Sequence, residues 1–225
     1  MLRFRCLHLD GSSEDVQLDG YALFCDGYTG RDQDAVMRHV KELEEDLGVP
    51  APSSVPTCYP MAARLALQEP GEIEVYGART SGEIEPVLAV QGGRPRYLLV
   101  GSDHTDRGME AYSIPLAKNV APKILSTEAW AVDEVLDRWD ELELRSWSDG
   151  ELYQEAPLAL MLPLERLLAA VPADRLRDPS VIMGGTIPTV AGFRFGTRFE
   201  GSLSDRRSGR ELRIAYGVRV MEPIG

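Results

Sequence analysis

Two glutamates separated by one residue are the first feature of the sequence that could do chemistry. Glu83 and Glu85 lie in the segment Thr80–Val87. In a strand, residues two apart project from the same face with their Cα atoms about 6.6 Å apart. Adjacent carboxylates repel unless a proton or cation joins them, and hard oxygen ligands suit Mg²⁺, Mn²⁺ or Ca²⁺. The pair is therefore a candidate metal site, but a solvated strand face is the alternative, because Glu72 and Glu74 have the same spacing.

A second group of polar residues follows the apolar run at 97–100. It is the heptapeptide GSDHTDR, which begins at Gly101 and ends at Arg107. Polar side chains at the end of a buried strand are a common place for a functional site. The alternative is a helix N-cap, in which Asp103 or Thr105 accepts hydrogen bonds from backbone amides. The residues alone leave both interpretations open.

Three further features could contribute to a site. His39 and Glu42 lie three residues apart on a predicted helix, so Glu42 could hold one ring nitrogen while the other acts as a base. A surface His–Glu pair is the alternative. Lys118 could pair with carboxylates or be solvated. Gly185 and the glycine before it would let a ligand approach the backbone next to Thr186, although a tight turn explains them equally well.

Composition excludes several classes of partner. The 225 residues carry 36 acidic and 24 basic side chains, a formal charge of −12, which argues against binding nucleic acid or an anionic membrane. No apolar run approaches the roughly 18 residues of a membrane helix, and the first residues lack the apolar core of a signal peptide. The three cysteines lack a Cys-x-x-Cys spacing, which is typical of buried free thiols in a cytoplasmic protein. With three histidines, any metal is expected to be held mainly by carboxylates.

The elements that must position these residues are mostly strands. Alternating or apolar runs predict strands over 2–9, 15–18, 21–25, 73–76, 83–90, 96–100, 141–147, 151–154, 181–186, 194–203 and 210–221. Helices are expected over 32–47, 61–68 and 157–171, with short helices or irregular connections over 106–117 and 128–139. This pattern predicts an α+β, mostly β fold in which a mixed sheet rolls up with helices outside. A Pro/Ser segment at 50–56 predicts a boundary between a small N-terminal lobe, 1–56, and a main body, 57–225.

Three motifs in this order resemble the fumarylacetoacetase-like superfamily, in particular a bacterial branch of it. They are SGExEPVL from Ser81, GSDHTDR from Gly101 and GGTxP from Gly184. The resemblance implies a rolled mixed sheet of the fumarylacetoacetase C-terminal type with peripheral helices. It also implies Mg²⁺ or Mn²⁺ on Glu83, Glu85 and Asp103, with Lys118 charged beside these carboxylates.

The resemblance also implies the residues that meet the substrate. His39 and Glu42 match a His-x-x-Glu dyad on a segment that orders over the substrate. The residues assigned to substrate binding are Gln154, Gly185, Thr186 and Arg107. One departure is visible, because Ile187 separates Thr186 from the proline that follows it directly in the family. Relatives in the superfamily are commonly homodimers, so a homodimer is expected.

The reaction implied by the resemblance is hydrolysis of a C–C bond in a small 2,4-dioxo acid of the acylpyruvate type. The metal would chelate the carboxylate and 2-oxo group and stabilise an enolate, while His39 removes a proton from water. The same site would also support decarboxylase, tautomerase, hydratase or lyase chemistry on a 2-oxo acid. A non-catalytic metabolite-binding protein and a chain that binds no metal are the remaining alternatives.

Overall fold

The structure is a computed structural model that describes residues 1–47 and 51–222, without the side chains of residues 39, 42, 43, 46 and 47. Its strands are β1 (Leu2–Leu7), β2 (Ser13–Leu18), β3 (Ala22–Gly27), β4 (Thr57–Met61), β5 (Ala66–Gln68), β6 (Glu72–Tyr76), β7 (Thr80–Ser81), β8 (Ile84–Gln91), β9 (Arg94–Asp103), β10 (Thr105–Asp106), β11 (Lys123–Leu125), β12 (Glu128–Ala131), β13 (Glu143–Ser148), β14 (Glu151–Pro157), β15 (Ser180–Met183), β16 (Arg198–Asp205) and β17 (Arg210–Met221). Its helices are α1 (Gln33–Leu47), α2 (Arg107–Glu110), α3 (Ile114–Val120) and α4 (Leu164–Ala170), with 3₁₀ turns η1 (Ala63–Leu65), η2 (Val132–Glu134), η3 (Leu136–Glu141) and η4 (Leu158–Leu160). The mostly β, α+β class predicted from the sequence is confirmed.

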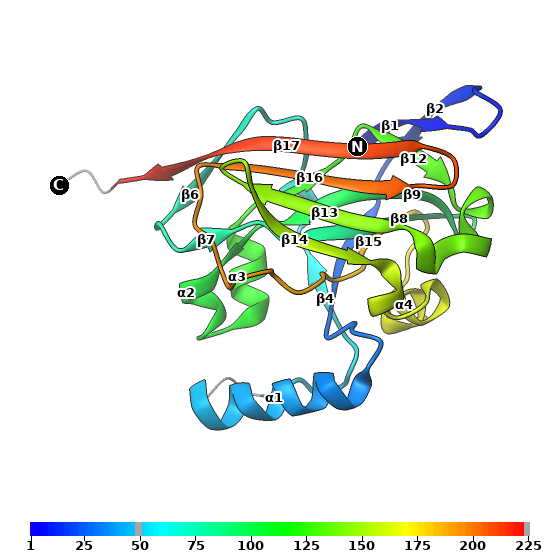
Figure 1. Cartoon of the computed structure of the whole chain (residues 1–225). Helices are drawn as coiled ribbons and strands as arrows, with labels where there is room; N and C mark the ends of the chain where they lie inside the picture. Colours follow the sequence, from blue (N-terminus) through cyan, green and yellow to red (C-terminus); the bar gives the residue numbers. More distant parts are fainter. Residues whose placement is uncertain (48–50, 223–225) are drawn as a thin grey trace.

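The strands form two large sheets, with the helices outside them (Figure 1). A ten-stranded mixed sheet has the order β2-β1-β12-β9-β8-β15-β3-β4, and β11 joins it by pairing with β9 and β5. A five-stranded sheet has the order β14-β13-β16-β17-β6, and β7 pairs with β10. Strands β1, β2 and β3 all precede residue 56, so the N-terminal segment shares its sheet with the later strands.

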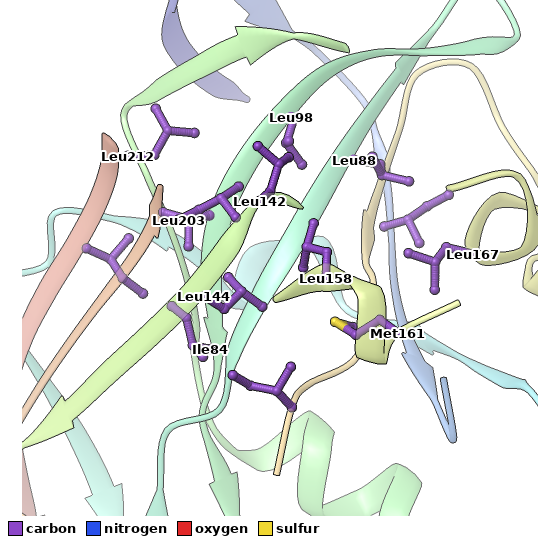
Figure 2. Packing of buried hydrophobic residues seen from close by; sticks show 14 of the residues in the cluster. Ile84, Leu88, Leu98, Leu142, Leu144, Leu158, Met161, Leu167, Leu203 and Leu212 are labelled. Atoms are coloured by element: carbon purple, nitrogen blue, oxygen red, sulfur yellow. The ribbon is translucent and has the colours of Figure 1, made fainter. Parts of the chain in front are cut away.

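The main core lies between the two sheets. Ile84, Leu88 and Leu98 from the larger sheet belong to the same buried cluster as Leu144 and Leu203 from the smaller one (Figure 2). A second cluster, which includes Val87 and Leu99, covers the opposite face of the larger sheet. Strand β8 is therefore buried on both faces, which accounts for its nearly continuous apolar sequence. An acidic residue in such a strand, as Glu85 is, cannot reach bulk water.

The clearest disagreement with the sequence prediction lies at 61–68. The helix expected there is wrong: the segment contains the end of β4, one 3₁₀ turn and β5. Strand β4 pairs with β3, and β5 pairs with β11, so these ladders determine the conformation of the segment.

Two other segments differ in part. The helix expected over 157–171 is divided into η4 and α4, and α4 begins directly after Pro163. Proline fits the start of a helix but not its interior, because it lacks an N–H and disfavours helical backbone in the residue before it. The segment 128–139, expected to be helical or irregular, begins with strand β12 and continues as 3₁₀ turns.

Helix α1 is the longest helix and lies outside both sheets (Figure 1). The Asp32 carboxylate accepts a hydrogen bond from the backbone N–H of Ala35 at 2.9 Å, which caps its first turn. Among the described residues, no helix has the length and apolar character needed to cross a membrane.

Candidate functional site

Three carboxylates meet where β8 begins and β9 ends. Carboxylate oxygens of Glu83, Glu85 and Asp103 lie within 4.8 Å of one another. Glu85 is in β8, Asp103 is the last residue of β9, and Glu83 directly precedes β8. The backbone N–H of Asp103 donates to the Glu83 carbonyl at 3.0 Å, which extends the β8–β9 pairing by one step. Antiparallel pairing thus brings together residues about 20 positions apart in the sequence.

Two glycines make this arrangement sterically possible. A Cβ at Gly82 would lie 2.6 Å from the Phe199 ring and 2.7 Å from the Tyr216 hydroxyl, so a side chain there would displace the neighbouring Glu83. Gly185 has a φ of +82°, and a Cβ on it would lie 2.1 Å from the Thr29 hydroxyl. Its backbone N–H donates to Glu85 Oε2 at 3.1 Å.

Two lysines hold Asp103 in its charged form. Lys118 forms an ion pair with one carboxylate oxygen, and Lys123 Nζ lies 2.7 Å from the other. Burial by itself would raise the pKa of Asp103. The positive charges of Lys118 and Lys123 have the larger combined effect and hold this pKa below its usual range. For Lys118, burial by itself would lower the pKa. The negative charges of Asp103 and Glu83 have the larger effect and raise this pKa, so the amine stays protonated.

Glu85 is a buried carboxylate that has no ion-pair partner among the described residues. The residue is 1% exposed. Burial, followed by the charge of Asp103, raises the pKa of Glu85 well above its usual value. Buried charges need a partner, and three clustered hard oxygens form a donor set suited to Mg²⁺ or Mn²⁺. The residues present therefore fit a divalent cation, which Glu83, Glu85 and Asp103 would hold.

The structure separates this glutamate pair from its equally spaced counterpart. Glu72 and Glu74 are exposed on β6, and both form ion pairs with Arg219. They are a solvated strand face, whereas Glu83 and Glu85 turn inward. The same local spacing thus has two outcomes, which depend on whether the strand lies at the surface or inside the fold.

The helix cap next to Asp103 is made by a different residue. Asp106 is the N-cap of α2, and its Oδ1 accepts from the Met109 backbone N–H at 3.0 Å. Neither Asp103 nor Thr105 has this role within the described structure. The Thr105 hydroxyl instead donates toward Asp103 Oδ1 at 3.3 Å. Asp103 is therefore available to the carboxylate cluster.

Arg107 lies inside the site and contacts the carboxylates. Its Nη2 lies 3.1 Å from Glu83 Oε1, and its Nη1 donates to Glu110 Oε2 at 2.8 Å. Its Nε donates to Ser81 Oγ at 2.8 Å, and the guanidinium carbon lies 4.4 Å from the centre of the Phe193 ring. The guanidinium thus orients Glu83. Substrate binding by Arg107 stays a prediction.

Gln154 has all of its hydrogen-bonding capacity occupied by the protein. Its Oε1 accepts from the Ile84 backbone N–H at 3.1 Å and from Ser146 Oγ at 2.9 Å. Its Nε2 donates to Thr186 Oγ1 at 2.8 Å and to the Ile187 carbonyl at 2.7 Å. Gln154 therefore joins the start of β8 to the loop after β15.

The Thr186 side chain lies at the edge of the site. Its hydroxyl donates to the Ile84 carbonyl at 2.8 Å and accepts from Gln154. A hydroxyl has only one hydrogen to donate. Direct donation to a ligand would therefore require Thr186 to release Ile84. Substrate contacts by Gln154, Gly185 and Thr186 stay predictions.

The remaining predicted residues lie on α1. The side chains of His39 and Glu42 lie outside the described residues, so their roles also stay predictions. Two site residues were not identified from the sequence. Lys123 resembles any lysine in a short apolar run, and Tyr216 is distant in the chain, yet its hydroxyl lies 2.8 Å from Ser102 Oγ and 3.0 Å from His104 Nδ1. Burial and the charge of Lys123 lower the pKa of His104 to about 3, so this ring is neutral.

Several solved structures share this fold. A protein from Oleispira antarctica, named as a candidate fumarylacetoacetate isomerase/hydrolase, superposes with a TM-score of 0.69 at 19% identity, over 95% of this chain and 99% of that one. The 5-carboxymethyl-2-hydroxymuconate delta-isomerase of Mycobacterium smegmatis gives 0.63 at 17% identity, over 99% and 100%. Fumarylpyruvate hydrolase of Pseudomonas aeruginosa, in complex with Mn²⁺ and pyruvate, gives 0.62 at 15% identity, over 97% of each chain. These likenesses establish a fumarylacetoacetate hydrolase-like fold, which occurs in enzymes of more than one reaction class.

Sequence comparison supplies the family. A search of curated proteins gives no significant match. The family model described as "Protein of unknown function (DUF2848)" matches residues 26–216, which include every strand from β4 to β16 and all three carboxylates of the site. Because the match extends over most of the sequence, the chain belongs to the DUF2848 family.

Proposed function

We propose that the protein is a divalent-metal-dependent enzyme that acts on a small 2-oxo acid, and that its reaction is hydrolysis of a C–C bond in a 2,4-dioxo acid. The observation that carries this proposal is the inward-facing cluster of Glu83, Glu85 and Asp103 with Lys118 beside it. The fold supports it, since two neighbours are named as a fumarylpyruvate hydrolase and an isomerase of an unsaturated acid.

The charges of the site favour an anionic ligand once a cation is bound. Four carboxylates, those of Glu83, Glu85, Asp103 and Glu110, face the cations of Arg107, Lys118 and Lys123. A bound Mg²⁺ or Mn²⁺ would reverse the resulting net negative charge, and it would act as a Lewis acid toward a 2-oxo group. A small acid with a carboxylate next to a ketone fits this charge.

In the proposed reaction, His39 takes a proton from water and Glu42 orients its ring. The water oxygen bonds to the carbonyl carbon farther from the substrate carboxylate. The C–C bond on the inner side of that carbon then breaks, and its electron pair stays with the carbon next to the 2-oxo group. That carbon takes up a proton, so the products are a carboxylic acid and a shorter 2-oxo acid. Thr186, held by Gln154, would orient the substrate carboxylate.

The experiment uses full-length protein stripped of metal and then supplied with Mg²⁺ or Mn²⁺. Loss of ultraviolet absorbance is followed for a panel of acylpyruvates, with oxaloacetate alongside. The variants are Asp103→Asn and His39→Ala. The matched controls are Glu74→Gln, from the solvated glutamate pair, and Arg38→Ala, which changes an exposed neighbour of His39. The same samples on a light-scattering column test the expected homodimer.

Cleavage of an acylpyruvate that requires metal, Asp103 and His39, but not Glu74 or Arg38, is the expected result. Loss of oxaloacetate that requires Asp103 but not His39 would replace hydrolysis with decarboxylase or tautomerase chemistry. Binding of metal without turnover of any compound would contradict the enzymatic proposal and favour a metabolite-binding protein. Absence of metal binding would contradict the site itself.

A further inference from the structure

A second cluster of metal-ligating side chains lies at the outer edge of the ten-stranded sheet. Cys6 is in β1, Glu14 is in β2, and His8 directly follows β1. Strands β2 and β1 are the first two in the order of that sheet, whereas the Glu83 carboxylate cluster lies where β8 and β9 meet. The Cys6, His8 and Glu14 cluster is therefore separate from the carboxylate cluster, and the proposed reaction does not use it.

The hairpin register brings the three side chains to one face. Cys6 and Glu14 are directly opposite each other in the antiparallel β1–β2 pair. His8 is two positions after Cys6, and its backbone N–H donates to the Ser12 carbonyl at 2.9 Å, which continues the pairing. One sulfur, one ring nitrogen and one carboxylate oxygen lie within 4.8 Å of one another. His8 Nε2 and Glu14 Oε1 are 4.0 Å apart.

The surroundings of His8 hold its Nδ1 and leave its Nε2 available to a metal. Glu134 Oε2 accepts hydrogen bonds from the Leu9 backbone N–H and from Arg210 Nη1, each at 3.0 Å. The other oxygen, Glu134 Oε1, lies 3.0 Å from His8 Nδ1. A carboxylate can only accept at this contact, so neutral His8 carries its proton on Nδ1. Nε2 then carries the free lone pair, and Glu14 Oε1 lies 4.0 Å from it.

This is the arrangement by which proteins prepare a histidine for a metal. Ligating imidazoles usually donate their other ring N–H to a carboxylate or carbonyl, which fixes the tautomer and the ring orientation. Charge pairing between His8 and the two glutamates would explain the positions of the ring and the carboxylates. That account leaves Cys6 as the end of the buried row of β1 that Leu2 and Phe4 begin, whereas a bound metal would give its sulfur a role in the triangle.

The donor set selects the class of metal. A thiolate, an imidazole and one carboxylate suit Zn²⁺, whereas Mg²⁺ prefers oxygen ligands alone. Tetrahedral Zn²⁺ places its ligand atoms about 3.5 Å apart, so the three side chains would have to close from separations of up to 4.8 Å. The Glu14 side chain is 53% exposed and that of His8 27% exposed, so an ion and a water ligand can reach the site from solvent. Cys6 is buried.

We infer that Cys6, His8 and Glu14 bind one Zn²⁺-class ion, with Glu134 holding His8 in position and water as the fourth ligand. Such an ion would fasten the β1–β2 hairpin at the edge of the sheet. It would stabilise the folded chain in proportion to metal concentration, because the unfolded chain does not hold the three ligands together. The expectation that carboxylates hold any metal in this chain then applies to the first site only.

The test is a Co²⁺ titration of reduced, metal-free, full-length protein in excess Mg²⁺, which competes with Co²⁺ for the proposed carboxylate site. Cobalt replaces zinc in such sites, and a thiolate ligand gives a sulfur-to-cobalt absorption band in the near ultraviolet. The variants are Cys6→Ser, His8→Gln and Glu14→Gln. The matched controls are Cys58→Ser, which removes a different thiol, and Glu128→Gln, which removes a carboxylate from the neighbouring strand β12.

We expect one Co²⁺ per chain with the thiolate band, displaced by one equivalent of Zn²⁺. Cys6→Ser should abolish the band, and His8→Gln and Glu14→Gln should weaken binding at least about tenfold. The two controls should leave the band unchanged. Absence of the band in the wild-type protein, or the same band in Cys6→Ser, would overturn the inference. Because His8 and Glu14 are partly exposed, their variants keep the test decisive even if Cys6→Ser does not fold. The Co²⁺ band and its displacement by Zn²⁺ do not depend on catalysis at the Asp103 site.

Discussion

Lys123 Nζ lies 2.7 Å from Asp103 Oδ1, and neither side chain has any exposed surface. The same amine donates to the His104 backbone carbonyl at 2.7 Å. Lys118 occupies the other carboxylate oxygen of Asp103, so one buried aspartate is held between two lysines. The carboxylate has a fixed position before any ligand arrives, because both of its oxygens are held.

Replacement of Lys123 by methionine should destabilise the protein by about 3 kcal/mol, because it leaves part of a buried charge uncompensated. Lys41→Met is the matched control. Lys41 forms an exposed i, i+4 pair with Glu45, and such pairs contribute no more than about 0.5 kcal/mol. Urea denaturation of the three proteins measures both effects. Equal midpoints for the two variants would contradict the structural role of Lys123.

Glu85→Gln should change stability in opposite directions with and without metal. Burial raises the pKa of Glu85, so its ionisation opposes folding at neutral pH, and a neutral amide removes that cost. The variant should therefore melt at a higher temperature than wild type in chelator, but it should gain little from Mn²⁺. We expect Mn²⁺ affinity to fall at least about tenfold. Thermal melts measure the change in stability and Mn²⁺ titration measures the change in affinity, with Glu74→Gln as the control. A wild-type response to Mn²⁺ in Glu85→Gln would exclude Glu85 as a ligand.

Gln154→Leu should cost about 3 kcal/mol of folding free energy. The change preserves volume but leaves the Ile84 N–H and the Ile187 carbonyl buried without their partner. It should also reduce Mn²⁺ affinity, because Ile84 lies between the two glutamates of the site. Gln17→Leu is the control, since Gln17 makes its hydrogen bonds on the exposed face of β2. If both leucine variants unfold at the same urea concentration, the four contacts of Gln154 do not stabilise the fold.

Asp26 should make stability depend on pH. Asp26 is buried, with 1% of the residue exposed, and it lies directly opposite Cys58 in the β3–β4 pair. Burial raises the pKa of Asp26 from 3.8 to about 8, and the Cys58 thiol offsets only a part of this.

The folded chain therefore binds one more proton than the unfolded chain between about pH 4 and pH 8. The contribution of Asp26 to stability is greatest below pH 4, and it falls as pH rises to 8 by at most about 1.4 kcal/mol per pH unit. Asp26→Asn should remove this slope, whereas Asp15→Asn at an exposed position should not. Denaturation measured at pH 5, 6, 7 and 8 compares the three proteins, and an unchanged slope in Asp26→Asn would contradict the prediction.

Local patterns in the sequence were sufficient for much of the fold. Alternating or apolar runs predicted strands at the positions of β1, β6, β13 and β14, and the helix expected over 32–47 agrees with α1. These signals depend on neighbours within one strand or helix, where spacing alone decides which side chains share a face. The prediction at 61–68 was wrong because pairing with β3 and β11, distant in sequence, decides the conformation of β4 and β5.

The sequence by itself determined the side-chain types available for chemistry: an acidic pair, an acidic motif after a strand, and a histidine and a glutamate three residues apart. Only the tertiary structure decided which of them act together. Glu83 and Glu85 turn inward while Glu72 and Glu74 remain in solvent, although their spacing is identical. Lys123 and Glu14 enter their sites through strand pairing, whereas Tyr216 reaches Ser102 and His104 from the other sheet. The reason is physical: burial and the distance to a counter-charge set the behaviour of an ionisable group, and both depend on the whole fold.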